Sequence, residues 1–145
     1  MPQNSVVMSC MNAVDTNVLI YLHDPRDPRK QSQATALVSA LRPGVLLWQV
    51  ACEYVAGARK LRTIGVSEAD IWTNLHLLQK HWSTIVPDLQ CLDRAQSLMQ
   101  QRSLSFWDAL LIGSAIESGI STLYSEDFSG VGPIGSLQIV NPFAP

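Results

Sequence analysis

Short apolar runs of strand length alternate along this chain with longer segments whose apolar residues recur every three or four positions. Strands are expected at Asn12–Val14, Val45–Trp48, Thr84–Val86, Ser121–Tyr124 and Leu137–Val140. Helices are expected at Thr16–Leu22, Lys30–Leu41, Gln49–Leu61, Ser67–Trp82, Leu92–Gln101 and Phe106–Ser118. This alternation predicts an α/β fold in which helices cover both faces of a mainly parallel sheet.

The length of the chain predicts one domain, because 145 residues leave no room for a second independent core. Residues 1–10 show little pattern and are expected to be a flexible N-terminal extension, so residues 11–143 would form the domain. No apolar run approaches the roughly 20 residues of a membrane span, and no signal peptide is recognisable. The three cysteines form no Cys-x-x-Cys pair and predict reduced, mostly buried thiols in a cytoplasmic protein.

Four acidic residues follow predicted strands or lie near the start of predicted helices. Asp15 comes directly after the first strand, and Asp127 lies three residues beyond the fourth. Glu53 lies five residues beyond the second strand, and Asp108 lies near the start of the last helix. Ligand sites in parallel sheets lie beyond the carboxyl ends of the strands. We therefore expect these four carboxylates to converge at one edge of the sheet.

A metal ion would explain such a cluster, because neighbouring carboxylates otherwise repel one another. Oxygen ligands without a nearby His or Cys favour Mg²⁺ or Mn²⁺, and these ions support phosphodiester hydrolysis. Each acid also has an ordinary alternative. Asp15 could cap a helix, Asp108 could complete a capping box with Ser105, and Glu53 and Asp127 could be surface residues. The spacing alone leaves both interpretations open.

The sequence around these acids resembles PIN domains, and most closely the VapC-type toxins of toxin–antitoxin pairs. The matching stretches are Val14-Asp15-Thr16-Asn17-Val18-Leu19-Ile20, Glu53 in its helix, Phe106-Trp107-Asp108-Ala109-Leu110 and Leu123-Tyr124-Ser125-Glu126-Asp127-Phe128. The ending Ile139-Val140-Asn141-Pro142-Phe143 resembles the close of many such toxins. The resemblance runs from about Met11 to Phe143, nearly the whole chain.

This resemblance implies a three-layer α/β/α fold and Mg²⁺- or Mn²⁺-dependent cleavage of RNA. By position, the acidic tetrad of the family corresponds to Asp15, Glu53, Asp108 and Asp127. Asp15 and Asp108 would bind the metal directly, whereas Glu53 and Asp127 would act through water or on a second ion. Ser125 would help to hold the site, and Asn17 would either orient Asp15 or cap the helix. The resemblance also implies a homodimer and a cognate antitoxin that covers the active-site groove.

Basic and aromatic residues suggest where partners could bind. Arg59, Lys60 and Arg62 follow Glu53 on one predicted helix, where they could contact RNA phosphates, contact an acidic residue of the antitoxin, or form an ordinary solvated face. The net charge of −2 does not exclude RNA, because metal ions at the acidic residues would attract phosphate. The four tryptophans could include a base-stacking platform, but core packing is the expected role for most of them.

Three other functions fit parts of the pattern. A PIN nuclease that acts in RNA processing would share the same site and differ from a toxin only in cells. A PIN-like module that binds RNA or protein without cutting would be indicated by a missing acid, but all four acids are present. A phosphatase with a nucleophilic Asp after the first strand usually needs a second Asp two positions later, and position 17 is Asn.

Overall fold

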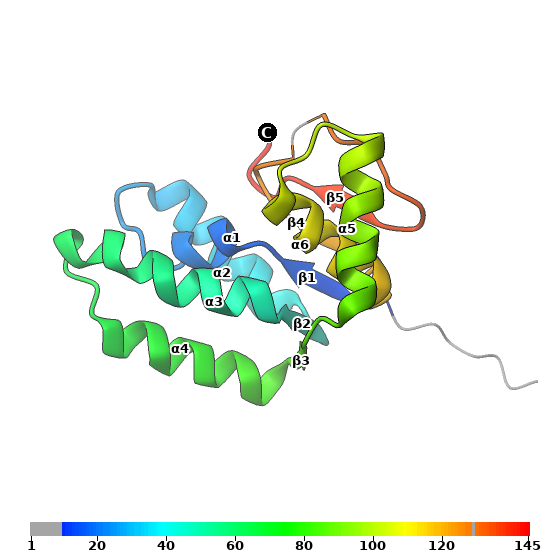
Figure 1. Cartoon of the computed structure of the whole chain (residues 1–145). Helices are drawn as coiled ribbons and strands as arrows, with labels where there is room; N and C mark the ends of the chain where they lie inside the picture. The colour runs from blue at the N-terminus through cyan, green and yellow to red at the C-terminus, as the bar shows by residue number, and fades with distance from the viewer. Residues whose placement is uncertain (1–9, 129) are drawn as a thin grey trace, which may run out of the picture.

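A single five-stranded parallel sheet forms the centre of the molecule in the computed structural model, which describes residues 10–128 and 130–145 (Figure 1). The strands are β1 (Asn12–Val14), β2 (Gly44–Leu47), β3 (Ser83–Ile85), β4 (Thr122–Tyr124) and β5 (Gln138–Val140). Their order in the sheet is β3-β2-β1-β4-β5. Residues 1–9 of the predicted N-terminal extension lie outside the described residues.

Helices cover this sheet and give the expected three-layer α/β/α fold. They are α1 (Thr16–Tyr21), α2 (Pro28–Ala40), α3 (Trp48–Gly57), α4 (Glu68–His81), α5 (Leu89–Gln101) and α6 (Phe106–Glu117). A 3₁₀ segment, η1 (Ala58–Ile64), extends α3 and ends at Gly65, whose φ of 90° favours glycine. The predicted helix Gln49–Leu61 therefore changes its winding after Gly57. Among the described residues, no helix is both long and apolar enough to cross a membrane.

The strand order determines where a ligand site can form. From β1 the chain adds β2 and β3 on one side and then returns to place β4 and β5 on the other. The direction of winding therefore reverses between β1 and β4, which pair in parallel register. Loops that leave adjacent strands at such a point diverge, and ligands bind in the crevice between them. Asp15 follows β1 and Ser125 follows β4 at this crevice.

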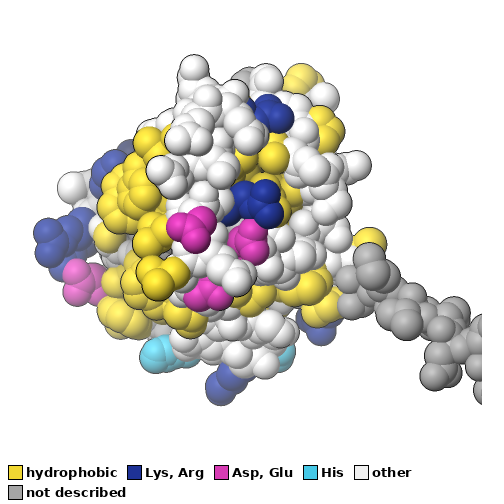
Figure 2. Space-filling model, turned by 45° about the vertical axis from the view of Figure 1, so that its right-hand side comes forward, with side chains coloured by type: hydrophobic (Ala, Val, Ile, Leu, Met, Phe, Trp, Pro, Cys, Tyr) yellow, Lys and Arg dark blue, Asp and Glu magenta, His cyan; other side chains and the backbone are white. Residues whose placement is uncertain are grey.

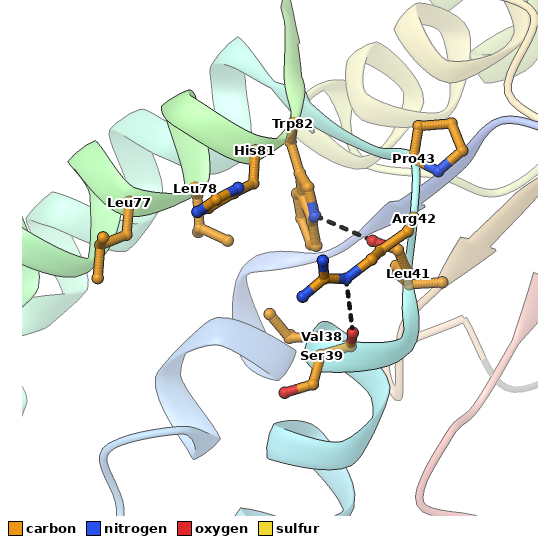
Figure 3. A pocket seen from close by; sticks show the side chains of 9 residues that line it. All are labelled: Val38, Ser39, Leu41, Arg42, Pro43, Leu77, Leu78, His81 and Trp82. Atoms are coloured by element: carbon orange, nitrogen blue, oxygen red, sulfur yellow. Dashed lines mark hydrogen bonds between the residues drawn. The ribbon is translucent and has the colours of Figure 1, made fainter.

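At the opposite, amino ends of β2 and β3, Trp82 packs tightly against the backbone. A Cβ at Gly44 would lie 2.2 Å from the Trp82 ring, so only glycine leaves room for it. The Trp82 indole N–H donates to the Leu41 carbonyl at 3.2 Å. A pocket of about 540 Å³ opens between α2 and α4 beside this ring (Figure 3). Its lining includes Arg42 and His81, and its place at the amino ends separates it from the acidic residues.

The prediction that most tryptophans pack in the core was wrong. Trp82 is buried. The other three tryptophans are about half exposed or more, with exposed fractions of 50% for Trp48, 48% for Trp72 and 63% for Trp107. They lie on α3, α4 and α6, on helix faces that turn away from the sheet. The expectation of mostly buried thiols was also wrong, because the free thiols of Cys10 and Cys52 are exposed and only that of Cys91 is buried.

Candidate active site

Asp15 lies directly after β1, where the chain leaves the sheet beside β4. Its backbone N–H donates to the Tyr124 carbonyl at 2.8 Å, so the pairing of β1 with β4 fixes its position. Its side chain is only 5% exposed. Oδ1 accepts the Thr16 N–H at 2.7 Å and Oδ2 accepts the Ser125 hydroxyl at 2.7 Å. Asp15 therefore caps α1 and is also a buried, fixed carboxylate, so the two interpretations of this residue are compatible.

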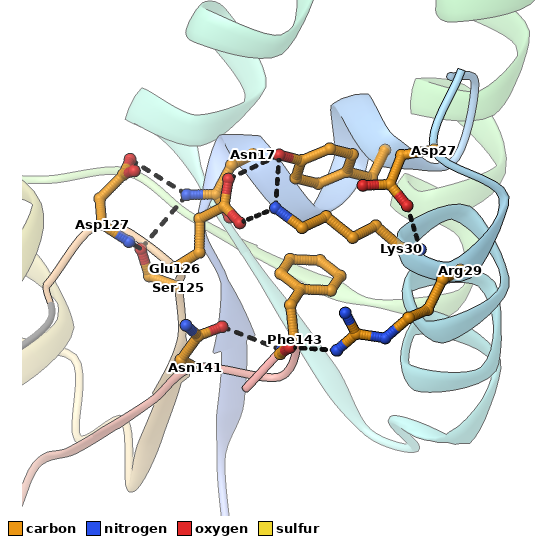
Figure 4. Close-up of polar contacts among 10 residues, drawn as sticks. Asn17, Asp27, Arg29, Lys30, Ser125, Glu126, Asp127, Asn141 and Phe143 are labelled. Carbon is orange, nitrogen blue, oxygen red and sulfur yellow. Dashed lines mark hydrogen bonds and ion pairs between the residues drawn. The ribbon is translucent and has the colours of Figure 1, made fainter. Parts of the chain in front are cut away.

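Ser125 connects the turn after β4 to Asp15. It is 2% exposed, and its backbone N–H donates to the Val140 carbonyl at 2.9 Å. Its Oγ accepts the Asp127 N–H at 3.1 Å and the Asn17 amide at 3.3 Å. The Asn17 amide also donates to Asp127 Oδ2 at 3.1 Å (Figure 4). Asn17 therefore acts on Asp15 through Ser125 and holds Asp127 directly.

Glu53, on α3, faces the same crevice. Its Oε2 accepts the Thr16 hydroxyl at 2.8 Å, and its Oε1 accepts the Gln49 amide at 2.9 Å. The same Gln49 amide donates to the Trp107 carbonyl at 3.0 Å, which ties the start of α6 to α3. Neither Thr16 nor Gln49 was predicted as a site residue. One signal was available, because Gln49 precedes Glu53 by four positions and so lies on the same helix face.

Asp108 lies in the first turn of α6, one residue after the carbonyl that Gln49 contacts. Its N–H donates to Ser105 Oγ at 3.2 Å, which is half of the expected capping box. Within residues 10–128 and 130–145, the reciprocal bond from the Ser105 N–H to the Asp108 carboxylate is not formed. The Asp108 side chain is exposed. The cap therefore uses the backbone of Asp108 and leaves its carboxylate available.

The structure thus brings Asp15, Glu53 and Asp127 together and places Asp108 at the start of the neighbouring helix. In the part of the chain that the structure describes, no three acidic, His or Cys side chains are arranged so that they already enclose a metal ion. Hydrogen bonds hold Glu53 and Asp127 to Thr16, Gln49 and Asn17 instead.

The pKa of Asp15 is raised to about 6, mainly by burial and to a smaller extent by the negative charges of Asp127 and Glu53. Hydrogen bonds from Ser125 and Thr16 act in the opposite direction but are outweighed. A buried carboxylate between two others is unfavourable when charged. A cation bound here would reverse that balance.

This pKa predicts how stability depends on pH in the metal-free protein. The folded pKa of about 6 exceeds the ordinary 3.8, so the folded state holds a proton that the unfolded chain releases between these values. The contribution of Asp15 to stability should therefore fall by about 2 kcal/mol as pH rises from 4 to 7. Urea unfolding of wild type and Asp15→Asn in a chelator would measure it as the pH-dependent difference. A difference that stays constant with pH would contradict the prediction.

A pocket of about 430 Å³ opens beside these residues, with Thr16, Asn17, Glu53, Lys60 and Asp127 among its lining. On the face that Figure 2 shows, acidic side chains lie beside a basic one, with hydrophobic side chains next to them.

The three basic residues that follow Glu53 lie in different surroundings. Lys60 lines it, whereas Arg59 lines a different pocket between α3 and α4. Arg62 forms an ion pair with Glu68 at the start of α4. Of the three, Lys60 is the residue placed beside the carboxylates.

Comparison with solved structures supports the fold. A toxin–antitoxin complex from Klebsiella pneumoniae is similar with a TM-score of 0.65 and 20% identity, over 90% of this chain and 97% of that one. VapBC2 from Rickettsia felis, solved with a DNA fragment from its promoter, is similar with a TM-score of 0.64 and 15% identity, over 89% of this chain and 96% of that one. Mycobacterium tuberculosis VapC20, a sarcin–ricin loop cleaving toxin, is similar with a TM-score of 0.64 and 17% identity, over 81% of this chain and 91% of that one.

No curated protein matches the chain in sequence. The family model of the PIN domain matches residues 13–129, which include Asp15, Glu53, Asp108 and Asp127. The matched range covers most of the chain and runs from β1 to the turn after β4. The chain therefore belongs to the PIN domain family.

Proposed function

We propose that this protein is a Mg²⁺- or Mn²⁺-dependent endoribonuclease and acts as the toxin of a toxin–antitoxin pair. The observation that carries the proposal is the buried Asp15 carboxylate, fixed by Ser125 and Thr16 beside the carboxylates of Glu53 and Asp127. Membership of the PIN family and structural similarity to toxins of such pairs support the same function.

The donor set fits a hard divalent cation. Asp15, Glu53, Asp108 and Asp127 would hold it, and all four supply carboxylate oxygens, which Mg²⁺ and Mn²⁺ prefer. Each Asp15 oxygen accepts one hydrogen bond and keeps a second lone pair. When bound, such an ion lowers the pKa of a water and neutralises charge that develops on the phosphate.

The side chains of the protein would orient the substrate and the carboxylates. Thr16 and Gln49 fix both oxygens of Glu53, so this side chain cannot swing freely. Asn17 fixes Asp127 in the same way. Lys60 would contact an RNA phosphate at the rim of the pocket, where its charge offsets the acidic residues.

Two protein partners belong to the proposal. A cognate antitoxin would cover the active-site groove in the cytoplasm. Arg59, which lines the pocket between α3 and α4, would offer it a positive charge. A second copy of the chain would bury the apolar surface that Trp48 and Trp107 form beside Cys52 and Ala56. An exposed apolar patch of this kind is characteristic of an interface.

The purified protein is expected to cleave RNA internally with Mg²⁺ or Mn²⁺. A chelator should reduce cleavage at least about 100-fold, and added Mn²⁺ should restore it, because the carboxylates alone supply no activated water. Gel analysis of a labelled RNA with an internal fluorophore would measure this. Release of inorganic phosphate without internal cuts would indicate a phosphatase, and binding without cleavage would indicate a non-catalytic module.

Expression in cells separates the toxin from an RNA-processing nuclease. A toxin should arrest growth, and co-expression of its antitoxin should restore growth. Cleavage in vitro without growth arrest would favour RNA processing.

A further inference from the structure

Glu126 lies between Ser125 and Asp127 in sequence, and its carboxylate contacts Tyr21 of α1 and Lys30 of α2 (Figure 4). Its Oε1 accepts the Tyr21 hydroxyl at 2.7 Å, and its Oε2 accepts the Lys30 ammonium group at 2.8 Å. Lys30 also donates to the Tyr21 hydroxyl at 3.1 Å. These three polar groups therefore close a ring of hydrogen bonds on the outer side of the turn.

The C-terminal segment completes this arrangement. The Phe143 ring is buried and meets the Tyr21 ring edge to face, with centroids 5.0 Å apart. The Lys30 Nζ lies 4.8 Å from the Tyr21 centroid and 5.6 Å from the Phe143 centroid, within range of a cation–π interaction. Arg29 donates to the Phe143 carbonyl at 2.7 Å, and the Phe143 N–H donates to Asn141 Oδ1 at 2.9 Å.

This cluster is more than a surface ion pair. The Lys30 and Glu126 side chains are only 26% and 22% exposed, so water screens their attraction less than on an open surface. Hydrogen bonds to Tyr21 fix both ends of the pair. Segments that are far apart in sequence, at α1, α2, the turn after β4 and the C-terminus, meet in this one place.

The turn is therefore held from two sides. On the inner side, Ser125 binds Asp15 and Asn17 binds Asp127. On the outer side, Glu126 is bound by Tyr21 and Lys30. Loss of the outer contacts would leave Glu126 free to rotate and would loosen the backbone that carries both neighbouring side chains.

We propose that Tyr21, Lys30 and Phe143 form an outer clamp that holds Glu126 and thereby positions Ser125 and Asp127 for catalysis. Lys30 is then a positioning residue, and the Asn141–Phe143 ending has a role in the active site although it contacts no substrate. The catalytic part of this inference rests on the proposed nuclease function. The positioning part does not, because the order of the turn can be measured without RNA or metal.

Three variants test the clamp. Lys30→Met keeps the apolar stem and removes the charge, Lys30→Arg keeps the charge, and Lys80→Met removes an exposed charge on α4 as the matched control. For Lys30→Met we expect kcat for RNA cleavage to fall about 10-fold, with KM within about twofold of wild type. Lys30→Arg should recover most of the loss, and Lys80→Met should match wild type.

Hydrogen exchange of the residue 125–127 amides supplies the independent readout. In Lys30→Met it should become several-fold faster, while the amides of α4 exchange as in wild type. A change in KM alone would overturn the proposal, because it would mean that Lys30 contacts RNA directly. Unchanged exchange in a folded Lys30→Met protein would also overturn it. If wild type binds Mn²⁺ but does not cleave RNA, the proposed nuclease function is wrong. The hydrogen-exchange result still tests whether Lys30 positions the turn.

Discussion

Replacing Asp15 with Asn is expected to reduce RNA cleavage by at least about 1,000-fold, equivalent to about 4 kcal/mol of transition-state stabilisation. Asn matches Asp in shape, so Oδ1 can still accept the Thr16 N–H that caps α1. The substitution removes the buried carboxylate whose two oxygens accept hydrogen bonds from Thr16 and Ser125. The loss should therefore come from metal binding and catalysis rather than from the fold.

Stability provides a sharp internal check on this variant. Because burial and neighbouring charges raise the pKa of Asp15, the charged side chain is unfavourable at pH 7 without metal. Asp15→Asn should then be as stable as wild type in a chelator, or more stable, while it loses cleavage. Titration with Mn²⁺, followed by thermal unfolding, should stabilise wild type and leave the variant nearly unchanged.

Asp93→Asn is the matched control, because Asp93 is an exposed carboxylate on α5, remote from the crevice. It should cleave RNA at the wild-type rate. Cleavage by Asp15→Asn within about tenfold of wild type would remove Asp15 from the catalytic site and with it the basis of the proposed function.

The sequence predicted the fold well because buried strands and capped helices have local signals. β1 begins and ends where expected, and β2 begins at Gly44, one residue before the expected Val45. Trp48 was assigned to the strand but begins α3. An apolar residue at the boundary between a buried strand and an apolar helix looks the same in either element, so periodicity could not place it.

The exposed tryptophans show a different limit of sequence analysis. Trp48 and Trp107 lie on helices whose other residues are also largely apolar. Without a clear polar face, the sequence does not say which side of these helices meets the sheet. Only the packing of α3 and α6 shows that both rings face outward.

The site was predictable where residues follow strands and unpredictable where distant segments meet. Asp15 and Ser125 could be anticipated from the ends of β1 and β4. Thr16 and Glu53 are 37 residues apart, Gln49 and Trp107 are 58 apart, and Lys30 and Glu126 are 96 apart. Such contacts depend on how the helices pack, so local sequence patterns do not predict them.

Asp108→Asn tests whether the fourth acid acts in catalysis or only begins α6, and we expect cleavage to fall about 100-fold with weaker Mn²⁺ binding. The structure allows this test because the cap uses the backbone N–H of Asp108, which Asn retains. Loss of the negative charge at a helix start should cost no more than about 1 kcal/mol of stability. A large activity loss with a small stability loss would therefore identify a metal ligand.

Ser105→Ala is the complementary variant, since it removes the capping oxygen and keeps the Asp108 carboxylate. It should lose about 1 kcal/mol of stability and retain cleavage, measured by urea unfolding and by the RNA assay under the same conditions. The opposite pattern, with Asp108→Asn active and less stable than Ser105→Ala, would make Asp108 a structural residue. In that case Asp15, Glu53 and Asp127, which the structure already brings together, would have to hold the metal ion without it.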